Sequence, residues 1–297
     1  MNHKITTCIN TNNNLNYLKL AVKSIRQNAY YKNQPIVIYA ENCTDGTNEW
    51  LQRNKEQLKL TFIIEENKIP KGIGGGMDIC VANSKTKFVN IIHSDMWIAP
   101  NQDIELLKLY DNIKESERLI ASSFRIQPKI FPNSPNSRPG VVFFPPESLG
   151  AYWDDFDSKS FDNWATSFSV ENDVTVRKGG GAGFFCRKKD YEFIGGNDPI
   201  FAPASFDDDD LFIRMQLEGY TFKMISKSTV YHFGARGSHF RDEAKDNFNK
   251  KSQRQTISEQ KNYIKFINKW GKLPEKDRFD FVKPIYGTNN NNIIPLI

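Results

Sequence analysis

The first hundred residues alternate short apolar runs of β type with patterns of helical period. We expect strands over residues 5–9, 36–40, 60–64 and 88–92. Between the first two runs, apolar residues recur at helical spacing, at Leu15, Leu18, Val22 and Ile25. Parallel strands need a long crossover, usually a helix, between them. The alternation therefore predicts an α/β fold with a mostly parallel central sheet flanked by helices.

The rest of the chain continues with less regular patterns. The segment 127–146 carries six prolines, so we expect a surface excursion there rather than continuous regular structure. The flanking patterns predict helices near 103–113 and 211–218, a strand near 119–125, regular structure near 179–187, and strands near 221–225 and 228–232. Residues 241–297 are polar, and one apolar helical face predicts a C-terminal helical extension followed by an irregular tail, the face being Tyr263, Phe266, Ile267 and Trp270.

Composition excludes several classes of protein. With 39% hydrophobic residues in 297, the chain can bury a core, and its net charge of +5 is spread along the sequence. We therefore expect no nucleic acid partner, although an anionic ligand fits the charge. No apolar run approaches the roughly 18 residues of a membrane helix, so we expect a cytoplasmic protein without an integral membrane segment. The four cysteines lie far apart and are expected to be reduced, mostly buried thiols.

Polar side chains gather where the predicted strands end. Residues 10–14 follow the first strand, Glu41 and Asn42 follow the second, and the sequence His93-Ser94-Asp95 follows the fourth. The last strand ends in a segment with two histidines, an arginine and two glycines, 232–239. Any one of these segments is compatible with an ordinary polar loop. Because open α/β sheets bind ligands at the carboxyl ends of their strands, their coincidence predicts an enzyme.

Four adjacent carboxylates, Asp207 to Asp210, stand immediately before an apolar helical pattern. A solvated helix start explains two of them, because carboxylates are favoured at the positive end of a helix dipole. Four in a row repel one another unless a cation, a proton or the helix end relieves them. We therefore expect a functional role for at least one of the four.

Together these segments resemble the family 2 glycosyltransferases of the GT-A fold. The resemblance covers about residues 4–240 in order. The matching segments are 11–18 and 41–47, similar to the first donor-binding turns; 70–78, similar to the glycine-rich donor loop; 90–95, at the D-x-D position; 179–185 and 194–198, before the catalytic acidic pair; 207–211, similar to that pair; and 230–232, similar to the metal-binding His strand.

The resemblance implies a role for each matched residue. It implies Asp208 as general base, Asp95 and His232 as ligands of Mn2+ or Mg2+, and a sugar-nucleotide donor with UDP favoured over GDP. Donor-binding residues would be Thr11, Asn13, Glu41, Gly75, Asp78, His93, Asp95, Arg236 and His239, and acceptor-binding residues would be Gly180, Gly181 and Asp207. The acceptor would be a glycan or glycoconjugate hydroxyl. Residues 1–240 would form the catalytic domain, with a nucleotide-binding half at 1–100 and a metal- and acceptor-binding half at 101–240.

The chain departs from the family pattern at three positions, and two other functions stay open. His93 replaces the first Asp of D-x-D, Glu41 replaces an Asp in a shortened turn, and Asp207 stands where Glu is frequent. The first alternative is a nucleotidyltransferase that makes an activated sugar, which needs a glycine-rich, basic phosphate loop after the first strand. The second is a non-catalytic carbohydrate-binding relative, which His93 favours.

Overall fold

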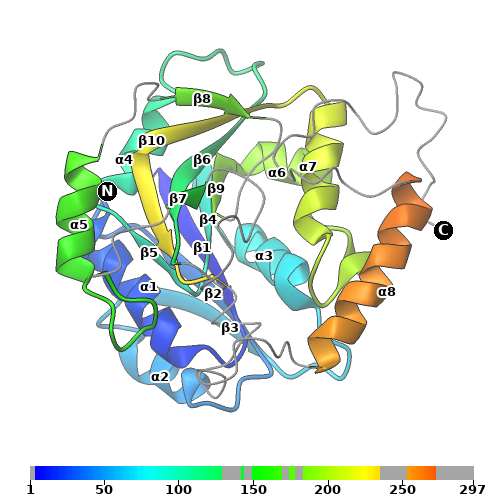
Figure 1. Cartoon of the computed structure of the whole chain (residues 1–297), viewed down its shortest axis with the longest axis horizontal. Helices are drawn as coiled ribbons and strands as arrows, with labels where there is room; N and C mark the ends of the chain where they lie inside the picture. The colour runs from blue at the N-terminus through cyan, green and yellow to red at the C-terminus, as the bar shows by residue number, and fades with distance from the viewer. Residues whose placement is uncertain are drawn as a thin grey trace.

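One ten-stranded sheet runs through the protein. The computed structural model describes residues 4–128, 142–143, 149–168, 174–177, 183–234 and 253–271. The strand order is β3-β2-β1-β4-β9-β6-β10-β5, with β7 paired to β6 and β8 paired to β10. Helices lie on both faces of this sheet (Figure 1). The predicted α/β class is therefore confirmed.

The first half is parallel and matches the sequence prediction closely. Its strands are β1 (Ile5–Thr11), β2 (Ile36–Glu41), β3 (Leu60–Glu65) and β4 (Phe88–His93). They are joined by α1 (Leu15–Asn28), α2 (Thr47–Asn54) and α3 (Gly72–Ala82). Each expected strand continues one or two residues further, and these added residues are polar or charged. They carry the polar side chains directly to the end of the sheet.

The second half makes the sheet mixed. Its strands are β5 (Met96–Ile98), β6 (Leu119–Ile126), β7 (Val142–Phe143), β8 (Val174–Arg177), β9 (Phe184–Arg187) and β10 (Thr221–His232). Its helices are α4 (Gln102–Lys108), α5 (Ser158–Ser167), α6 (Lys188–Ile194), the 3-10 helix η2 (Pro199–Phe201), α7 (Asp207–Leu217) and α8 (Gln253–Trp270). Strands β5, β8 and β9 pair antiparallel with their neighbours.

Three boundaries differ from the sequence prediction. The helix expected near 103–113 ends at Lys108. The two strands expected at 221–225 and 228–232 are one strand, β10, whose register against β6 shifts between Ile225 and Thr229. The helix expected from residue 211 begins at Asp207, because its first turn accepts all four carboxylates at the positive end of its dipole.

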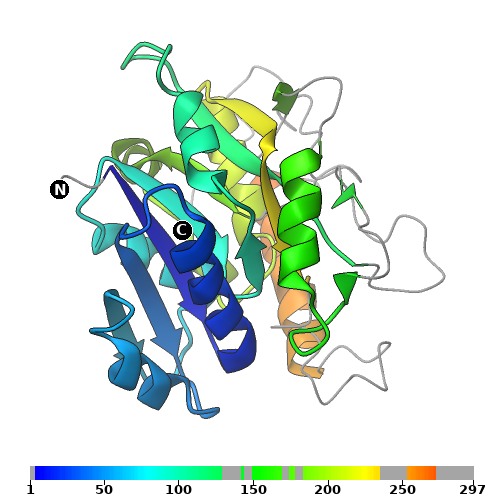
Figure 2. The same ribbon diagram turned by 90° about the vertical axis from the view of Figure 1, so that its left-hand side faces the viewer.

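The helices of the first half divide between the two faces. On one face α1 packs its apolar side on the strands, and Leu18 and Val22 are buried against Ile9 and Ile38. Figure 2 shows α1 and α5 in front of the sheet on this side. On the other face α3, α6 and α7 cover the sheet (Figure 1). This layering leaves the carboxyl ends of the strands at one edge, away from the helices' apolar faces.

The buried thiols behave as expected from the sequence. All four cysteines are free, and Cys8, Cys80 and Cys186 are buried while Cys43 is partly exposed. Burial raises the pKa of Cys80 to about 12. A thiol that stays protonated at neutral pH is a poor nucleophile, so these side chains serve as core residues.

Helix α8 is held to the domain by a buried ion pair network. The Lys269 ammonium lies 2.6 Å from an oxygen of Asp198 and 2.6 Å from an oxygen of Asp210, and all three side chains are buried. The indole of Trp270 also donates to Asp210, at 2.9 Å. The expected apolar face is confirmed in part, since Phe266 and Trp270 are buried while Tyr263 is exposed. Helix α8 thereby fixes the first turn of α7.

None of the helices in the described ranges combines the length and the apolar character needed to cross a membrane.

Replacing Lys269 with alanine should destabilise the protein by on the order of 3 kcal/mol, because the buried Asp198 and Asp210 carboxylates lose their shared cation. Urea unfolding measures this free energy. Lys261→Ala is the matched control, since Lys261 is an exposed lysine of the same helix and its loss should cost no more than about 0.5 kcal/mol. Equal effects of the two substitutions would show that the buried pair does not hold α8 in place.

Candidate active site

The parallel strands of the sheet, β2 and β3 included, end at the same edge, and this edge is called here the carboxyl edge. Strands β1 and β4 are parallel, β9 runs antiparallel to both β4 and β6, and β10 is parallel to β6. Strands β1, β4, β6 and β10 consequently point the same way. Their last residues include Thr11, His93 and His232. The edge predicted from sequence to carry the chemistry is therefore formed in the structure.

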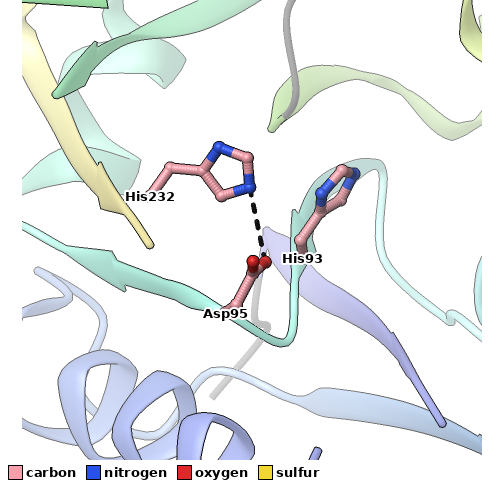
Figure 3. A group of neighbouring side chains, drawn as sticks. All are labelled: His93, Asp95 and His232. Carbon is pink, nitrogen blue, oxygen red and sulfur yellow. Dashed lines mark ion pairs between the residues drawn. The ribbon is translucent and has the colours of Figure 1, made fainter. Parts of the chain in front are cut away.

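His93, Asp95 and His232 form a compact cluster at the carboxyl edge (Figure 3). One ligand atom from each of the three lies within 4.8 Å of the other two. The Nε2 atom of His232 is 3.4 Å from a carboxylate oxygen of Asp95. The rings of His93 and His232 meet edge to face, with centroids 5.5 Å apart. Asp95 and His232, the predicted metal ligands, therefore lie close together, and His93 is a third possible ligand beside them.

Backbone pairing holds Asp95 and His232 together. Asp95 lies in the tight turn between β4 and β5, and β5 pairs antiparallel with β10 so that Met96 faces His232. The Phe233 amide then donates to the Asp95 carbonyl at 3.0 Å. The buried Ser94 hydroxyl accepts from the Asn14 side chain at 2.8 Å, which ties the same turn to the loop after β1.

Burial sets the charge states in this cluster. Burial lowers the pKa of His232 to about 4 although Asp95 opposes the shift, so this imidazole is neutral at pH 7. Burial by itself would raise the pKa of Asp95, but its contacts with His232 and His93 outweigh burial and hold that pKa below its usual value. At neutral pH the cluster therefore offers a carboxylate and a neutral imidazole, both of which have lone pairs ready to bind a cation.

The cluster fits a divalent cation. Two imidazoles and one carboxylate are a donor set that suits Mn2+ and related metals. The Nδ1 atom of His232 is buried and has no hydrogen-bond partner among the described residues. A buried polar atom without a partner is costly, so its environment is incomplete in the protein alone. When bound, a cation here would neutralise the negative charge of a phosphate group.

The sequence profile of glycosyl transferase family 2 matches residues 6–174, more than half of the chain. The chain belongs to this family. The segment His93-Ser94-Asp95, predicted to lie at the D-x-D position, places His93 close to Asp95 and His232 (Figure 3). The position therefore keeps a metal-binding type of side chain with nitrogen in place of oxygen. No curated protein sequence matches the chain.

Solved structures show the same fold at low identity. A crystal structure of GalNAc-T7 with UDP, GalNAc and Mn2+ superposes with a TM-score of 0.57 at 12% identity, covering 77% of this chain and 44% of that one. The crystal structure of S. aureus TarS gives 0.50 at 14% identity, covering 78% and 37%. These likenesses establish the GT-A type of fold, and this chain spans less than half of either protein.

Thr11 and Asn13, two of the residues predicted to bind the donor, differ in their hydrogen bonds. The Thr11 hydroxyl, at the carboxyl edge, is buried and has no hydrogen-bond partner among the residues that the structure describes. Asn13 uses its side-chain oxygen to accept from the Thr44 amide at 2.5 Å. This bond locks the loop after β1 to the loop after β2. Both residues remain donor-binding predictions, and Thr11 has the freer polar atom.

Glu41 organises the start of helix α3. Its buried carboxylate accepts from the backbone amides of Lys71 at 2.7 Å and Gly72 at 3.0 Å. It also accepts from the Asn67 amide at 2.8 Å and the Tyr39 hydroxyl at 3.1 Å. A carboxylate that accepts several hydrogen bonds at a helix start stabilises that start. Glu41 thus shapes the glycine-rich loop, a task that sequence reasoning did not assign to it.

Asp78 has a similar internal role. One of its oxygens accepts from the Tyr191 hydroxyl at 2.6 Å and from the Asn197 backbone and side chain, each at 3.0 Å. These bonds join α3 to the segment after α6. Gly75 lies in the first turns of α3, where an added Cβ would approach only the Lys71 side chain. Their roles in donor binding stay predictions.

Asp45, in the turn between β2 and α2, hydrogen-bonds to the starts of two helices. One oxygen accepts from the Thr47 amide at 3.1 Å and its hydroxyl at 2.6 Å, at the start of α2. The other accepts from the Leu15 amide at 2.8 Å, at the start of α1. One carboxylate therefore accepts hydrogen bonds at two helix N-termini.

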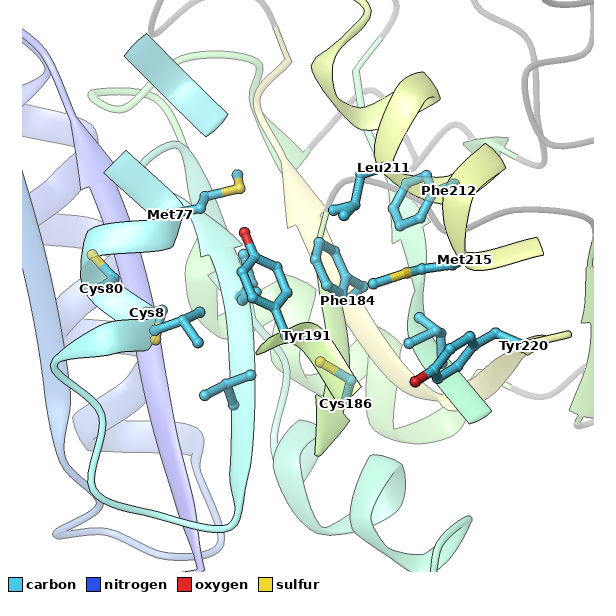
Figure 4. Close-up of a cluster of buried hydrophobic side chains, with 14 of the residues drawn as sticks. Cys8, Met77, Cys80, Phe184, Cys186, Tyr191, Leu211, Phe212, Met215 and Tyr220 are labelled. Carbon is cyan, nitrogen blue, oxygen red and sulfur yellow. The ribbon is translucent and has the colours of Figure 1, made fainter. Parts of the chain in front are cut away.

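The four consecutive carboxylates, Asp207 to Asp210, differ in their exposure to solvent. Asp208 is exposed, and its side chain accepts from the next backbone amide, of Asp209, at 3.0 Å. Asp210 is fully buried and bound to Lys269, Trp270 and Arg214. Asp207 is 8% exposed. The helix that carries them is anchored by apolar residues at its other face, including Leu211, Phe212 and Met215 (Figure 4).

Four of the predicted site residues lie outside the described ranges. They are the acceptor-binding Gly180 and Gly181 and the donor-binding Arg236 and His239.

Mn2+ at saturating concentration should raise the melting temperature by about 5 °C, because a cation that binds only the folded protein stabilises it. Differential scanning calorimetry with and without EDTA measures the shift. His232→Ala and Asp95→Asn should lose it, whereas Asp111→Asn, which changes an exposed carboxylate away from the cluster, should keep it. A full Mn2+ shift in His232→Ala would place the metal elsewhere.

Proposed function

We propose that this protein transfers a sugar from a nucleotide-diphosphate donor to a hydroxyl group of a glycan or glycoconjugate, with inversion at the anomeric carbon. The observation that carries the proposal is the cluster of His93, Asp95 and His232 at the carboxyl edge, with ligand atoms within 4.8 Å of one another. Membership of glycosyl transferase family 2 supports the reaction type.

A divalent cation, Mn2+ or Mg2+, would be held by Asp95, His232 and His93 and would offset the charge that develops on the departing diphosphate. The neutral His232 can bind it without first losing a proton. Thr11 and Asn13 would contact the nucleoside, since Thr11 ends β1 at the carboxyl edge and Asn13 follows it. UDP is the favoured nucleotide because GalNAc-T7 and TarS structures, similar in fold, contain it.

Asp208 would act as the general base. Its carboxylate would take the proton of the acceptor hydroxyl while that oxygen attacks the anomeric carbon from the face opposite the diphosphate. The bond between the anomeric carbon and the diphosphate oxygen breaks, and its electron pair leaves with the nucleoside diphosphate. Exposure favours Asp208 over Asp210 for this task, because Asp210 is buried and already bound to two cationic side chains.

One alternative is a protein with the same fold that binds carbohydrate but does not catalyse transfer. A carbohydrate-binding relative would use the same cluster to hold a nucleotide sugar and would never cleave it, and the replacement at His93 favours this reading. Slow hydrolysis of UDP sugars in the presence of Mn2+ would separate the two, because only a catalytic site activates the anomeric carbon.

UDP should bind in a metal-dependent manner. Isothermal titration calorimetry should detect UDP with Mn2+ and lose it when EDTA is added, since the cation neutralises the diphosphate. GDP should bind more weakly under the same conditions. Equal affinity with and without metal for both nucleotides would remove the basis of the proposal.

Asp208→Asn should reduce transfer by a factor on the order of 10² to 10⁴, the usual effect of removing a positioned base, while UDP affinity and stability stay unchanged. Asp210→Asn is the matched comparison in the same turn, and it should chiefly lower stability because Lys269 and Arg214 lose a buried partner. If Asp208→Asn transfers sugar at the wild-type rate while Asp210→Asn is stable but inactive, Asp210 rather than Asp208 is the base. Retained anomeric configuration in the product, read by NMR, would exclude single displacement.

A further inference from the structure

Gln127 is a fully buried polar side chain that the proposed function does not use. It follows β6 directly, its exposed fraction is 0%, and neither its amide oxygen nor its amide nitrogen has a hydrogen-bond partner among the residues that the structure describes. Burying an amide without partners is unfavourable, and proteins satisfy nearly all such groups. The Gln127 amide is therefore left for a partner other than the described residues of the chain.

Strand pairing locates Gln127 beside the metal cluster. Strands β6 and β10 pair in parallel as far as Ile126 and Tyr231, so the next residues along the two strands are Gln127 and His232. Neighbouring strands lie about 4.8 Å apart. An ideal Cβ built on Gly234, two residues beyond His232, would lie 3.5 Å from the amide oxygen of Gln127. The amide consequently lies next to the chain that leaves the cluster.

The carboxyl edge holds other polar atoms in the same condition. The Thr11 hydroxyl and the Nδ1 atom of His232 are also buried there without hydrogen-bond partners. A second buried glutamine, Gln102, shows the contrast. Its amide is satisfied by Asn90 at 2.9 Å and Ser123 at 2.8 Å. Gln102 thus shows that this protein can fully hydrogen-bond a buried glutamine amide, whereas Thr11, Gln127 and His232 at the carboxyl edge keep unpartnered polar atoms.

The two hydrogen-bonding atoms of the unpartnered Gln127 amide indicate which ligand groups it can bind. A primary amide offers an accepting oxygen and a donating nitrogen side by side, and sugar hydroxyls can both donate and accept. Diphosphate oxygens only accept and would leave the Gln127 oxygen unmatched. A cation would leave the nitrogen unmatched. Two neighbouring hydroxyl groups match both atoms.

We propose that Gln127 recognises the sugar of the donor, by hydrogen bonds from its amide to ring hydroxyl groups beside the metal cluster. This inference rests on the proposed function and names the residue that would recognise the sugar of the donor rather than its nucleotide. A site that hydrogen-bonds a hydroxyl rejects ligands that lack it, so Gln127 would set which hexose is accepted.

Gln127→Met tests this directly, because methionine has a similar length and no hydrogen-bonding amide. Affinities for UDP and for a panel of UDP-glucose, UDP-galactose and their N-acetylamino forms should be measured by calorimetry with Mn2+, together with melting temperatures. We expect UDP affinity to change by less than about twofold and affinity for the preferred UDP sugar to fall by about 10- to 100-fold. The melting temperature of the ligand-free protein should rise, because an unsatisfied amide has been removed.

Gln34→Met is the matched control. Gln34 is equally buried, and both of its amide atoms also lack hydrogen-bond partners, but it precedes β2 at the opposite end of that strand. Its replacement should raise the melting temperature in the same way and leave UDP-sugar binding unchanged. The difference between the two variants isolates the effect of position from the effect of removing a buried amide.

Three results would overturn the inference. Unchanged UDP-sugar affinity in Gln127→Met, with wild-type binding intact, would do so and leave the proposed function standing. Equal losses for UDP and UDP sugars would make Gln127 a support of the metal cluster. Failure of the wild-type protein to bind any nucleotide, with or without Mn2+, would overturn the proposed function and this inference with it.

Discussion

The antiparallel pairing of β10 with β5 is the interaction on which the candidate site depends. It sets Met96 opposite His232, and the amide of Phe233 bonds to the Asp95 carbonyl at 3.0 Å. Without this pairing, Asp95 would end a turn after β4 and His232 would end a strand from a distant part of the sequence. Backbone hydrogen bonds are directional, so a register fixed on one strand fixes the side chains of the other. The cluster follows from sheet geometry rather than from the side chains' attraction for one another.

Two groups of buried polar side chains in this protein differ in whether their polar atoms have partners. Around Lys269, the carboxylates of Asp198 and Asp210 are fully paired, which is how a protein stabilises charge that has no further task. At the carboxyl edge, polar atoms of Thr11 and His232 are buried and unpartnered. That state costs stability and is typical of sites that bind a ligand. The contrast separates the scaffold of α7 and α8 from the edge where donor binding is proposed.

Helix α7 connects the buried ion pairs around Lys269 to the residue proposed as the base. Its first turn contains both the buried Asp210, bound to α8, and the exposed Asp208, proposed as the base. Neighbouring residues in a helix point about 100° apart, so anchoring one carboxylate determines where the others point. The C-terminal helix is far from the metal cluster in sequence, yet it orients the residue that would activate the acceptor.

Much of the site was predictable because its residues follow apolar strands. Glu41 and His93 were located directly after predicted strands, Thr11 was located in the polar segment 10–14 after the first strand, and the motif order indicated the family. The contacts of Glu41 and Asp78 were not predictable, since they depend on backbone amides and side chains brought in by other helices. Gln127 gave no signal in sequence, because a glutamine at the end of a strand is unremarkable until its burial and its missing partners are seen.

The sequence by itself determined the α/β architecture, the edge at which polar groups gather and the motifs of the family, because hydrophobic periodicity and residue type act locally. Only the tertiary structure decided that His93 joins Asp95 and His232, that Asp208 rather than Asp210 is exposed, and that β10 is one continuous strand. These outcomes depend on which strands pair and which side chains are buried by distant elements. Pairing and burial are properties of the whole folded chain, so no local pattern encodes them.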